Sequence, residues 1–313
     1  MQGIFIVLPL LIIIVIGNRL RAYGFYSEKN IAALAKTLFY VILPALMFRT
    51  TYIAGGSALS QPNLFCASAI CFLLTMIFAY IAARFLVHRG DLKRTAVAVF
   101  ASYRSNNIYL GLPVIQLAMG EAGMNEAAVY LAVISVSFQM LSVAAGEMII
   151  HGRLSAGSMT SVFRKLVRNP LILSCSAGVA FALCGVPIHF VIDETLKLMG
   201  SAATAVALLA LGGTLDLSHT GAVAGMIRRT WFDILVKLVL NPVLMYVLFS
   251  IFPVSDNMLK VAVMMGAMPT SVDSFIMARG MGMDSEYAAD LVAATTIMCM
   301  FAIPVWAYIL HMV

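Results

Sequence analysis

The sequence predicts an all-α polytopic membrane protein, and its composition, its apolar spans and two matched helix breaks each support this fold class. Hydrophobic residues make up 62% of the 313 positions, charged residues make up only 11%, and the mean hydropathy is +0.98. A soluble domain carries about 25% charged residues. This chain has too little polar surface for water, so we expect it to lie in a lipid bilayer.

Ten stretches are long and apolar enough to be transmembrane helices, because about 20 apolar residues cross a bilayer core. The seventh carries charged residues, Asp193, Glu194 and Lys197, at or before its start. The ten stretches are approximately 3–20, 31–53, 64–87, 95–118, 126–150, 169–187, 199–217, 229–252, 258–280 and 288–311.

Lysine and arginine are concentrated in alternate loops, and this asymmetry sets the orientation in the membrane. One set of loops carries only Lys197 and Lys260. The other set carries Arg19, Arg21, Lys29, Arg84, Arg89, Lys93, Arg94, Arg153, Arg164, Lys165, Arg168, Arg228, Arg229 and Arg279. Because the positive loops face the cytoplasm, both termini are expected outside it. The net charge of +6 then faces anionic lipid, which argues against nucleic acid as a partner.

The longest connection, residues 151–168, divides the chain into two units of five spans. Residues 1–150 form the first five-helix repeat and residues 169–313 form the second, joined by this basic cytoplasmic loop. Since five is odd, the second unit enters the membrane with the opposite polarity. The span count therefore predicts two inverted repeats that meet at the membrane midplane.

A polar stretch that contains proline interrupts one apolar span in each unit. It runs from Arg104 to Pro113 in span four and from Met268 to Ser274 in span nine. A helix break at membrane depth frees backbone groups that lipid cannot satisfy but a polar cavity can. A matched pair of such breaks is the best sequence indication of a carrier's binding site, so we predict a site where they meet.

In the first break, Asn106 and Asn107 are the leading candidates for substrate binding. Pro113 opposes a continuous helix and Gly111 permits an opened backbone. Asparagine amides both donate and accept hydrogen bonds, which suits a carboxylate, an ion or freed backbone carbonyls. The alternative is that both amides only satisfy the broken helix. Arg104 lies too deep to reach the membrane surface, and it either attracts an anionic substrate or neutralises Asp273.

In the second break, Asp273 is the candidate for coupling or gating. A carboxyl at this depth binds a cation, exchanges a proton or pairs with a base such as Arg104. Pro269, Thr270 and Ser271 surround the same break and are included in the predicted site, although the hydroxyls commonly bond to their own helix. Asp233 and Lys237, spaced i, i+4 in span eight, are expected to form a structural ion pair.

The sequence contains no set of residues that indicates an enzyme or a metal site. The five cysteines lie in apolar stretches without CxxC spacing or histidine neighbours, so they are expected to be buried packing residues. No HExxH, GxSxG or Walker lysine motif is present. We therefore expect no catalytic residues, no metal and no cofactor, with coupling to protons or sodium left open.

Six short motifs, in order and on successive spans, resemble the auxin efflux carrier family. This family comprises prokaryotic and plant carriers, among them the PIN-type auxin exporters and the malonate or malate permeases. The resemblance covers essentially the whole chain. The motifs are Ile42 to Phe48 in span two, Asn106 to Pro113, Asn169-Pro170-Leu171-Ile172, Ala207 to Gly213, Lys237 to Pro242, and Ala267-Met268-Pro269-Thr270.

The resemblance implies ten helices in two inverted repeats, with helices four and nine broken and crossing at the midplane. Helices 1, 2, 6 and 7 would form a scaffold, usually homodimeric, and helices 3–5 and 8–10 a mobile transport unit. An elevator motion would carry the site across the membrane, and Asn106 corresponds to the family's substrate-contacting asparagine. Position 273 is commonly neutral in relatives, so Asp273 favours a proton- or cation-linked mechanism here.

From these observations we predict a secondary-active carrier of a small organic anion, such as a mono- or dicarboxylate, working by efflux or exchange. The expected location is the inner membrane of a prokaryotic cell. One alternative keeps the architecture and is a sodium-coupled symporter of the bile-acid type. A membrane enzyme and a channel are the more remote alternatives.

Overall fold

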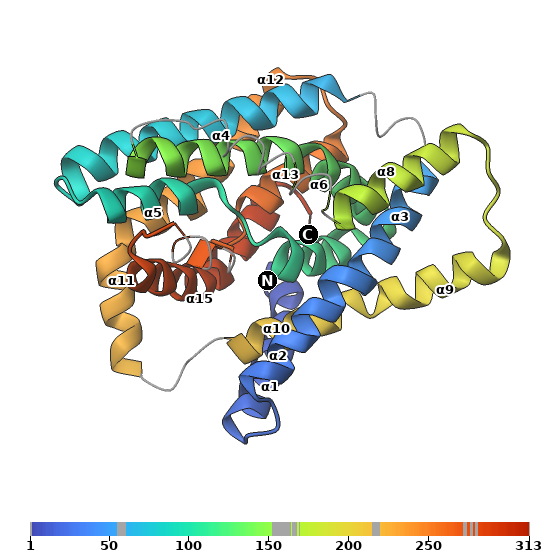
Figure 1. The fold of residues 1–313 in the computed structure, drawn as a ribbon, viewed down its shortest axis with the longest axis horizontal. Coiled ribbons are helices and arrows are strands. Elements are labelled where there is room, and N and C mark those ends of the chain that lie inside the picture. The colour runs from blue at the N-terminus through green and yellow to red at the C-terminus, as the bar shows by residue number, and fades with distance from the viewer. Residues whose placement is uncertain are drawn as a thin grey trace.

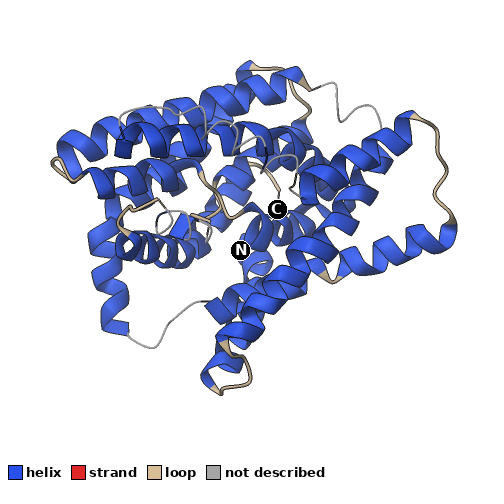
Figure 2. Ribbon diagram, in the orientation of Figure 1, coloured by secondary structure: helices blue, strands red, loops and turns tan. Residues whose placement is uncertain are grey.

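The computed structural model describes residues 2–54, 61–151, 164, 168, 170–214, 220–271, 274, 275, 278 and 281–312. Their regular secondary structure is helical, apart from one isolated β-bridge between Ser105 and Thr270 (Figure 2). The elements labelled η are π-helical turns. In chain order the elements are α1 (Gln2–Ala22), α2 (Glu28–Thr37), η1 (Leu38–Ile42), α3 (Leu43–Ala54), α4 (Pro62–Ala82), η3 (Ala83–Val87), α5 (Leu92–Tyr103), η4 (Asn107–Gly111), α6 (Leu112–His151), α8 (Pro170–Leu183), α9 (Phe190–Ser201), α10 (Ala203–Thr214), α11 (Thr220–Leu235), η5 (Val236–Leu240), α12 (Asn241–Ile251), α13 (Asp256–Gly266) and α15 (Ser285–Ile309).

Side-chain caps fix where several of these helices begin. Ser27 accepts a hydrogen bond from the backbone N–H of Asn30, and Ser255 accepts one from Met258. Asp91 and Asp284 cap α5 and α15 in the same way. Each cap satisfies a first-turn N–H that has no partner inside its own helix. Serine and aspartate side chains thus cap the N-termini of these helices.

Five helical stretches of the described chain are long and apolar enough to cross a membrane. They overlap predicted spans two, three, seven, eight and ten, although the stretch at span seven begins at Phe190 and not at 199. Helix α8 is a shorter apolar helix at the place of span six. The all-α membrane fold is therefore confirmed, whereas the ten-helix inverted repeat stays a prediction. The five stretches are Glu28–Ile53, Pro62–Val87, Phe190–Gly213, Val223–Ile251 and Ser285–Ile309.

Spans four and five are joined by a bend and not by the expected loop. Helix α6 runs through both, and only Gly120 leaves helical geometry, at φ 61° and ψ −145°. Glycine adopts a positive φ without the steric cost that a side chain brings. The second half of the broken span four therefore continues directly into span five.

The helices pack in two groups, which can be followed in Figure 1. In one group α1 and α2 pack against α10, and α3 packs against α8 and α9. In the other, α4 packs against α5, α6 and α12, α13 packs against α6 and α12, and α11 packs against α15. The groups touch where α3 meets α6, where α1 meets α15 and where α10 meets η4, and α6 also contacts α1 and α8. These are the two sets of helices that the resemblance divides into scaffold and transport unit, although their roles stay predictions.

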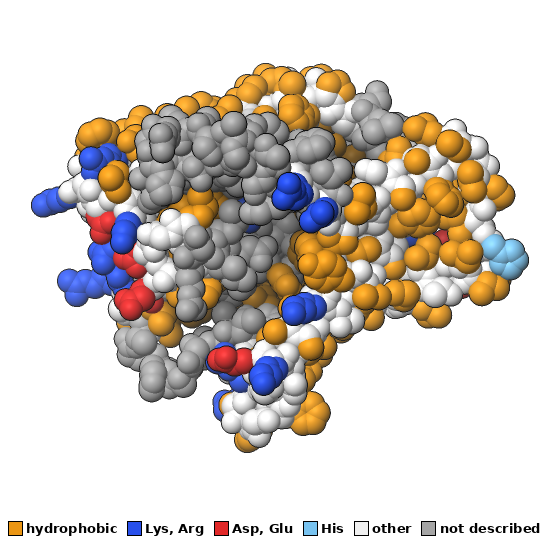
Figure 3. All heavy atoms as spheres, viewed as in Figure 1, with side chains coloured by type: hydrophobic (Ala, Val, Ile, Leu, Met, Phe, Trp, Pro, Cys, Tyr) orange, Lys and Arg blue, Asp and Glu red, His pale blue; other side chains and the backbone are white. Residues whose placement is uncertain are grey.

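Hydrophobic side chains cover much of the described part of the face seen in Figure 3. Many polar side chains are instead buried. Helix α4 illustrates this arrangement, because Ile77 and Ile81 are about half exposed at 54% and 52% while Ser68 and Thr75 are fully buried. A water-soluble protein shows the opposite distribution. Such a surface suits contact with lipid, and the polar interior suits a site within the helix bundle.

Candidate functional site

The two helix breaks predicted from the sequence meet in the structure. Helix α5 ends at Tyr103, and the chain is extended from Arg104. Helix α13 ends at Gly266, and the chain passes through a turn at Ala267 before it reaches Pro269. The backbone N–H of Asn106 donates to the carbonyl of Pro269 at 2.7 Å, and the N–H of Ser271 donates to the carbonyl of Arg104 at 2.9 Å. These two hydrogen bonds form a short antiparallel contact. We call it, together with Ser274, whose N–H donates to the Ser271 carbonyl at 2.9 Å, the crossover (residues 104–107, 267–271 and 274). The breaks thus satisfy part of each other's freed backbone.

Asn106 and Asn107 each have one buried side-chain atom without a hydrogen-bond partner among the described residues. Asn106 caps η4, because its Oδ1 accepts a hydrogen bond from the Tyr109 N–H at 3.2 Å. Its Nδ2 is buried and has no hydrogen-bond partner among the described residues, and the same holds for Asn107 Oδ1 and Ser274 Oγ. Leaving such a group unsatisfied costs about 1–3 kcal/mol. The crossover therefore holds a donor, an acceptor and a hydroxyl that are available to a ligand.

The other predicted residues of the second break mainly brace the crossover. Thr270 Oγ1 donates to the carbonyl of Ala101 at 3.3 Å, and the Thr270 N–H donates to Thr295 Oγ1 at 3.2 Å. Pro269 contributes its carbonyl, and Ser271 contributes its backbone N–H. Asp273, predicted for coupling or gating, lies outside the described residues. Its role stays a prediction.

Arg104 is buried at the crossover, with only 2% of its surface exposed. Its guanidinium carbon lies 4.9 Å from the centroid of the Phe100 ring, one helical turn earlier on α5. A desolvated cation–π contact of this kind is worth about 2 kcal/mol. The ring stabilises a positive charge inside the bundle, while the hypothetical pair with Asp273 lies outside the described residues.

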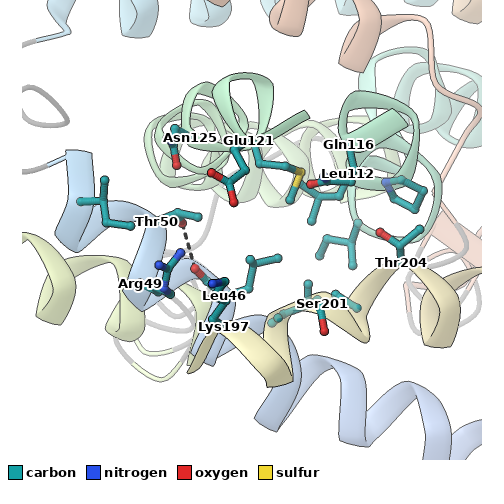
Figure 4. A pocket seen from close by; sticks show the side chains of 17 residues that line it. Leu46, Arg49, Thr50, Leu112, Gln116, Glu121, Asn125, Lys197, Ser201 and Thr204 are labelled. Carbon is teal, nitrogen blue, oxygen red and sulfur yellow. Dashed lines mark hydrogen bonds between the residues drawn. The ribbon is translucent and has the colours of Figure 1, made fainter. Parts of the chain in front are cut away.

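Gly111 and Pro113 take different places beside the break. A Cβ added at Gly111 would lie 2.5 Å from Met265 Sδ, so this glycine lets η4 pack closely on α13. Pro113 instead lines a cavity of about 420 Å³ between the two helix groups (Figure 4). The cavity is bounded by η4 and α6 on one side and by α3, α9 and α10 on the other. Of the predicted site residues, Pro113 is the one found among the described lining residues.

The polar lining of this cavity was not predicted from the sequence. Arg49, on α3, forms a bidentate ion pair with Asp193 on α9, with distances of 2.8 and 3.2 Å. Lys197 lies across the cavity from Gln116 and Glu121 of α6 (Figure 4). Of the charges near the start of span seven, Lys197 therefore lines the cavity and Asp193 pairs with the lining residue Arg49. No spacing rule within the sequence indicates this, because α3 and α9 are distant along the chain.

The predicted ion pair between Asp233 and Lys237 is wrong. The π-helical turn η5 begins at Val236, and the two side chains have different partners. Asp233 accepts a hydrogen bond from the Tyr287 hydroxyl and lies 3.5 Å from His88 Nε2. Lys237 Nζ donates to Ser105 Oγ at 2.7 Å and to the carbonyl of Gly266 at 2.8 Å. Lys237, on η5, thus contacts the crossover through Ser105.

A charged cluster holds the helix ends around α15. Arg94 contacts Asp284 at 3.0 Å, Arg229 contacts Asp290 at 2.7 Å, and both guanidinium groups lie over the Tyr287 ring. Burial disfavours the charged form of Asp284, but the Tyr287 N–H and the Arg94 guanidinium outweigh it and lower the pKa of this carboxyl. The cluster ties α5, α11 and α15 together behind the crossover. Among the described residues, no group of three or more His, Cys, Asp or Glu side chains is placed to hold a metal ion.

A helical membrane protein whose two broken helices cross over buried polar groups has the architecture of a membrane transport protein. The comparisons with known proteins lead to the same class. A family model described as membrane transport protein matches residues 3–156 and 154–307. The chain therefore belongs to this family, that of the auxin efflux carriers, which identifies it as a transport protein and not an enzyme.

Relatives from archaea, bacteria and plants share low identity with the chain. An uncharacterised transporter of Methanothermobacter thermautotrophicus is 24% identical over 97% of both chains. A candidate malonate transporter of Rhizobium meliloti is 25% identical over 87% of this chain and 84% of its own length. Auxin efflux carrier component 5 of Arabidopsis thaliana is 27% identical over 40% of this chain and 36% of its own length.

Proposed function

We propose that this protein is a secondary-active carrier of a small organic anion, such as a mono- or dicarboxylate, with its binding site at the crossover. The observation that carries the proposal is the set of unused polar atoms there. Asn106 Nδ2, Asn107 Oδ1 and Ser274 Oγ are buried without a partner among the described residues. A bound carboxylate accepts from the amide and hydroxyl donors and relieves the cost of burying them.

Two buried basic side chains favour an anion over a neutral or cationic substrate. Arg104 and Lys237 both lie at the crossover, and they are 2% and 0% exposed. Charges at this depth cost at least about 2.5 kcal/mol each on insertion scales, so they require partners or a function. Lys237 has no carboxylate within 4.0 Å among the described residues, and an anionic substrate supplies one. The Rhizobium relative's name supports a dicarboxylate of the size of malonate.

Alternating access in this proposal uses the two helix groups. The group of α1, α2, α3, α8, α9 and α10 acts as the scaffold and forms a homodimer, as the family resemblance implies. The group that contains the crossover moves against it as one body, in an elevator motion. The 420 Å³ cavity between the groups reaches the broken helix at Ile108, Leu112 and Pro113, and it serves as the access route from one side.

The protein lies in the inner membrane of a prokaryotic cell, with both termini outside the cytoplasm, as the distribution of Lys and Arg predicts. Asp273 couples transport to protons or gates the site. No ATP-binding motif is present in the sequence, so the substrate gradient or an ion gradient supplies the driving force.

Counterflow in proteoliposomes tests the carrier function. Vesicles are loaded with unlabelled malonate, malate, succinate or a monocarboxylate, and uptake of the labelled compound is followed with and without sodium or proton gradients. We expect saturable uptake that depends on the internal anion and is strongest for a small mono- or dicarboxylate. Uptake that does not saturate and ignores the internal anion would indicate a channel, and uptake of no carboxylate would contradict the proposed substrate class.

A further inference from the structure

Lys237 contacts the crossover and is more deeply buried than Arg104. A lysine at a membrane surface extends its ammonium group into water, whereas that of Lys237 donates to buried oxygen atoms. Lys237 lies on η5, is 0% exposed, and donates to Ser105 Oγ and to the Gly266 carbonyl at 2.7 and 2.8 Å. Asn241, one turn further on, donates to the same carbonyl at 2.9 Å. Two side chains, one helical turn apart, therefore donate hydrogen bonds to the last residue of α13.

Both partners of Lys237 lie at the C-terminal end of a half-helix. Gly266 is the last residue of α13, and Ser105 follows α5, which ends at Tyr103. The last carbonyls of a helix lack partners within it and carry the negative end of its dipole. In carriers with broken helices, such ends and unwound carbonyls coordinate the coupling cation. Here an ammonium group attached to the chain stands in that position.

The positive charge of Lys237 has no carboxylate partner within 4.0 Å among the described residues. The acid one turn away, Asp233, is used by Tyr287 and His88. An ammonium group has three N–H donors, and the structure assigns two of them. Ser105, which accepts a hydrogen bond from Lys237, directly precedes Asn106 and Asn107 in the chain. The positive charge of Lys237 is therefore close in the structure to the residues that carry the unpaired Asn106 Nδ2 and Asn107 Oδ1.

We propose that the Lys237 ammonium is a tethered cation that takes the place of a coupling metal ion at the crossover, and that the substrate's carboxylate balances its charge. This inference rests on the proposed carrier function and deepens it. Two consequences follow. Exchange needs no sodium, and anion binding depends on the charge at position 237 and not only on the volume of the side chain.

Transport by charge-deleted variants tests the second consequence. Lys237→Met keeps most of the length of the side chain and removes the charge, and its folding is checked by thermal unfolding in detergent. We expect counterflow at least about 100-fold weaker, as for the loss of one partner of a buried charge pair. Lys260→Ala on α13, where Lys260 pairs with Asp256 at 2.7 Å, is the control and should transport like the wild type.

Chemical rescue tests the cation site by itself. Lys237→Ala leaves Ser105 Oγ without its donor and leaves the Gly266 carbonyl with Asn241 alone. Methylammonium chloride supplies the same charged group in solution. We expect methylammonium, but not choline, to raise both the counterflow and the thermal unfolding midpoint of Lys237→Ala, with no effect on the wild type. The unfolding measurement needs no transport, so it reports on the cation site even if the wild type exchanges no carboxylate and the proposed function fails.

Three results would overturn the inference. They are wild-type exchange that requires sodium, folded Lys237→Met that exchanges at the wild-type rate, and Lys237→Ala that methylammonium neither stabilises nor reactivates. The first result would show that sodium, and not the Lys237 ammonium, is the cation that exchange requires. The other two would make Lys237 a residue that only holds α13 against η5.

Discussion

Replacing Asn106 by alanine is expected to lower carboxylate counterflow about 10- to 100-fold, the effect of losing one or more hydrogen bonds to a charged group. Asn106 supplies the unused Nδ2 of the crossover, and its Oδ1 also caps η4. Asn106→Asp keeps a capping oxygen but places a negative charge where the amide donor stood. It should therefore fold and still fail to exchange anions, which separates binding from the structural role.

Asn63→Ala is the matched control for this substitution. Asn63 also uses its side-chain amide in a hydrogen bond, to the carbonyl of Pro253 at 2.9 Å, but it lies near the start of α4. Counterflow by Asn63→Ala should equal that of the wild type. Exchange unchanged in both Asn106 variants would show that the first break is only a structural interruption.

Replacing Gly212 by valine is expected to have the largest effect on folding. A Cβ at Gly212 would collide with the backbone carbonyl oxygen of Ile14, and one at Gly17 would collide with that of Leu209. Backbone cannot move aside as a flexible side chain does, so α1 and α10 would separate. Overpacking of this kind costs about 3 kcal/mol, and Asn18 and Arg21 of α1 would also lose the Gly212 and Gly213 carbonyls.

The thermal unfolding midpoint and the monodispersity of the purified protein measure this effect. Gly225→Val is the control, because a Cβ at Gly225 on α11 meets no atom within 4 Å. We expect Gly212→Val to give little folded protein and Gly225→Val to behave like the wild type. Equal yields and midpoints for both variants would show that α1 and α10 do not need close backbone contact.

The helical spans and the two breaks could be predicted because their causes are local in the sequence. About 20 apolar residues suffice to indicate a span, and Pro269 marks a place where a helix cannot continue. Pro113 does not end a helix, because the helix that resumes at Asn107 runs through it into α6. The seventh span was predicted despite Asp193 and Lys197, and the structure contains an apolar helical stretch from Phe190 to Gly213. The pairing of the breaks followed from their matched positions in the two halves.

The parts of the site that depend on contacts between distant helices could not be predicted. Helical spacing indicated an ion pair between Asp233 and Lys237, but the π-helical turn η5 changes the register, and Lys237 reaches Ser105 and Gly266. Similarly, nothing local to Arg49 indicates that it pairs with Asp193, 144 positions later, beside a cavity.

Accessibility of the crossover from both sides of the membrane tests the central claim most directly. Ser271→Cys, a nearly isosteric change, is made in a variant without the five native cysteines, and it is treated with a membrane-impermeant thiol reagent from either side of oriented vesicles. We predict reaction from both sides, slowed on both by the transported carboxylate. A thiol that reacts from one side only, or at a rate that the carboxylate does not change, would contradict a crossover site that alternates between the two faces.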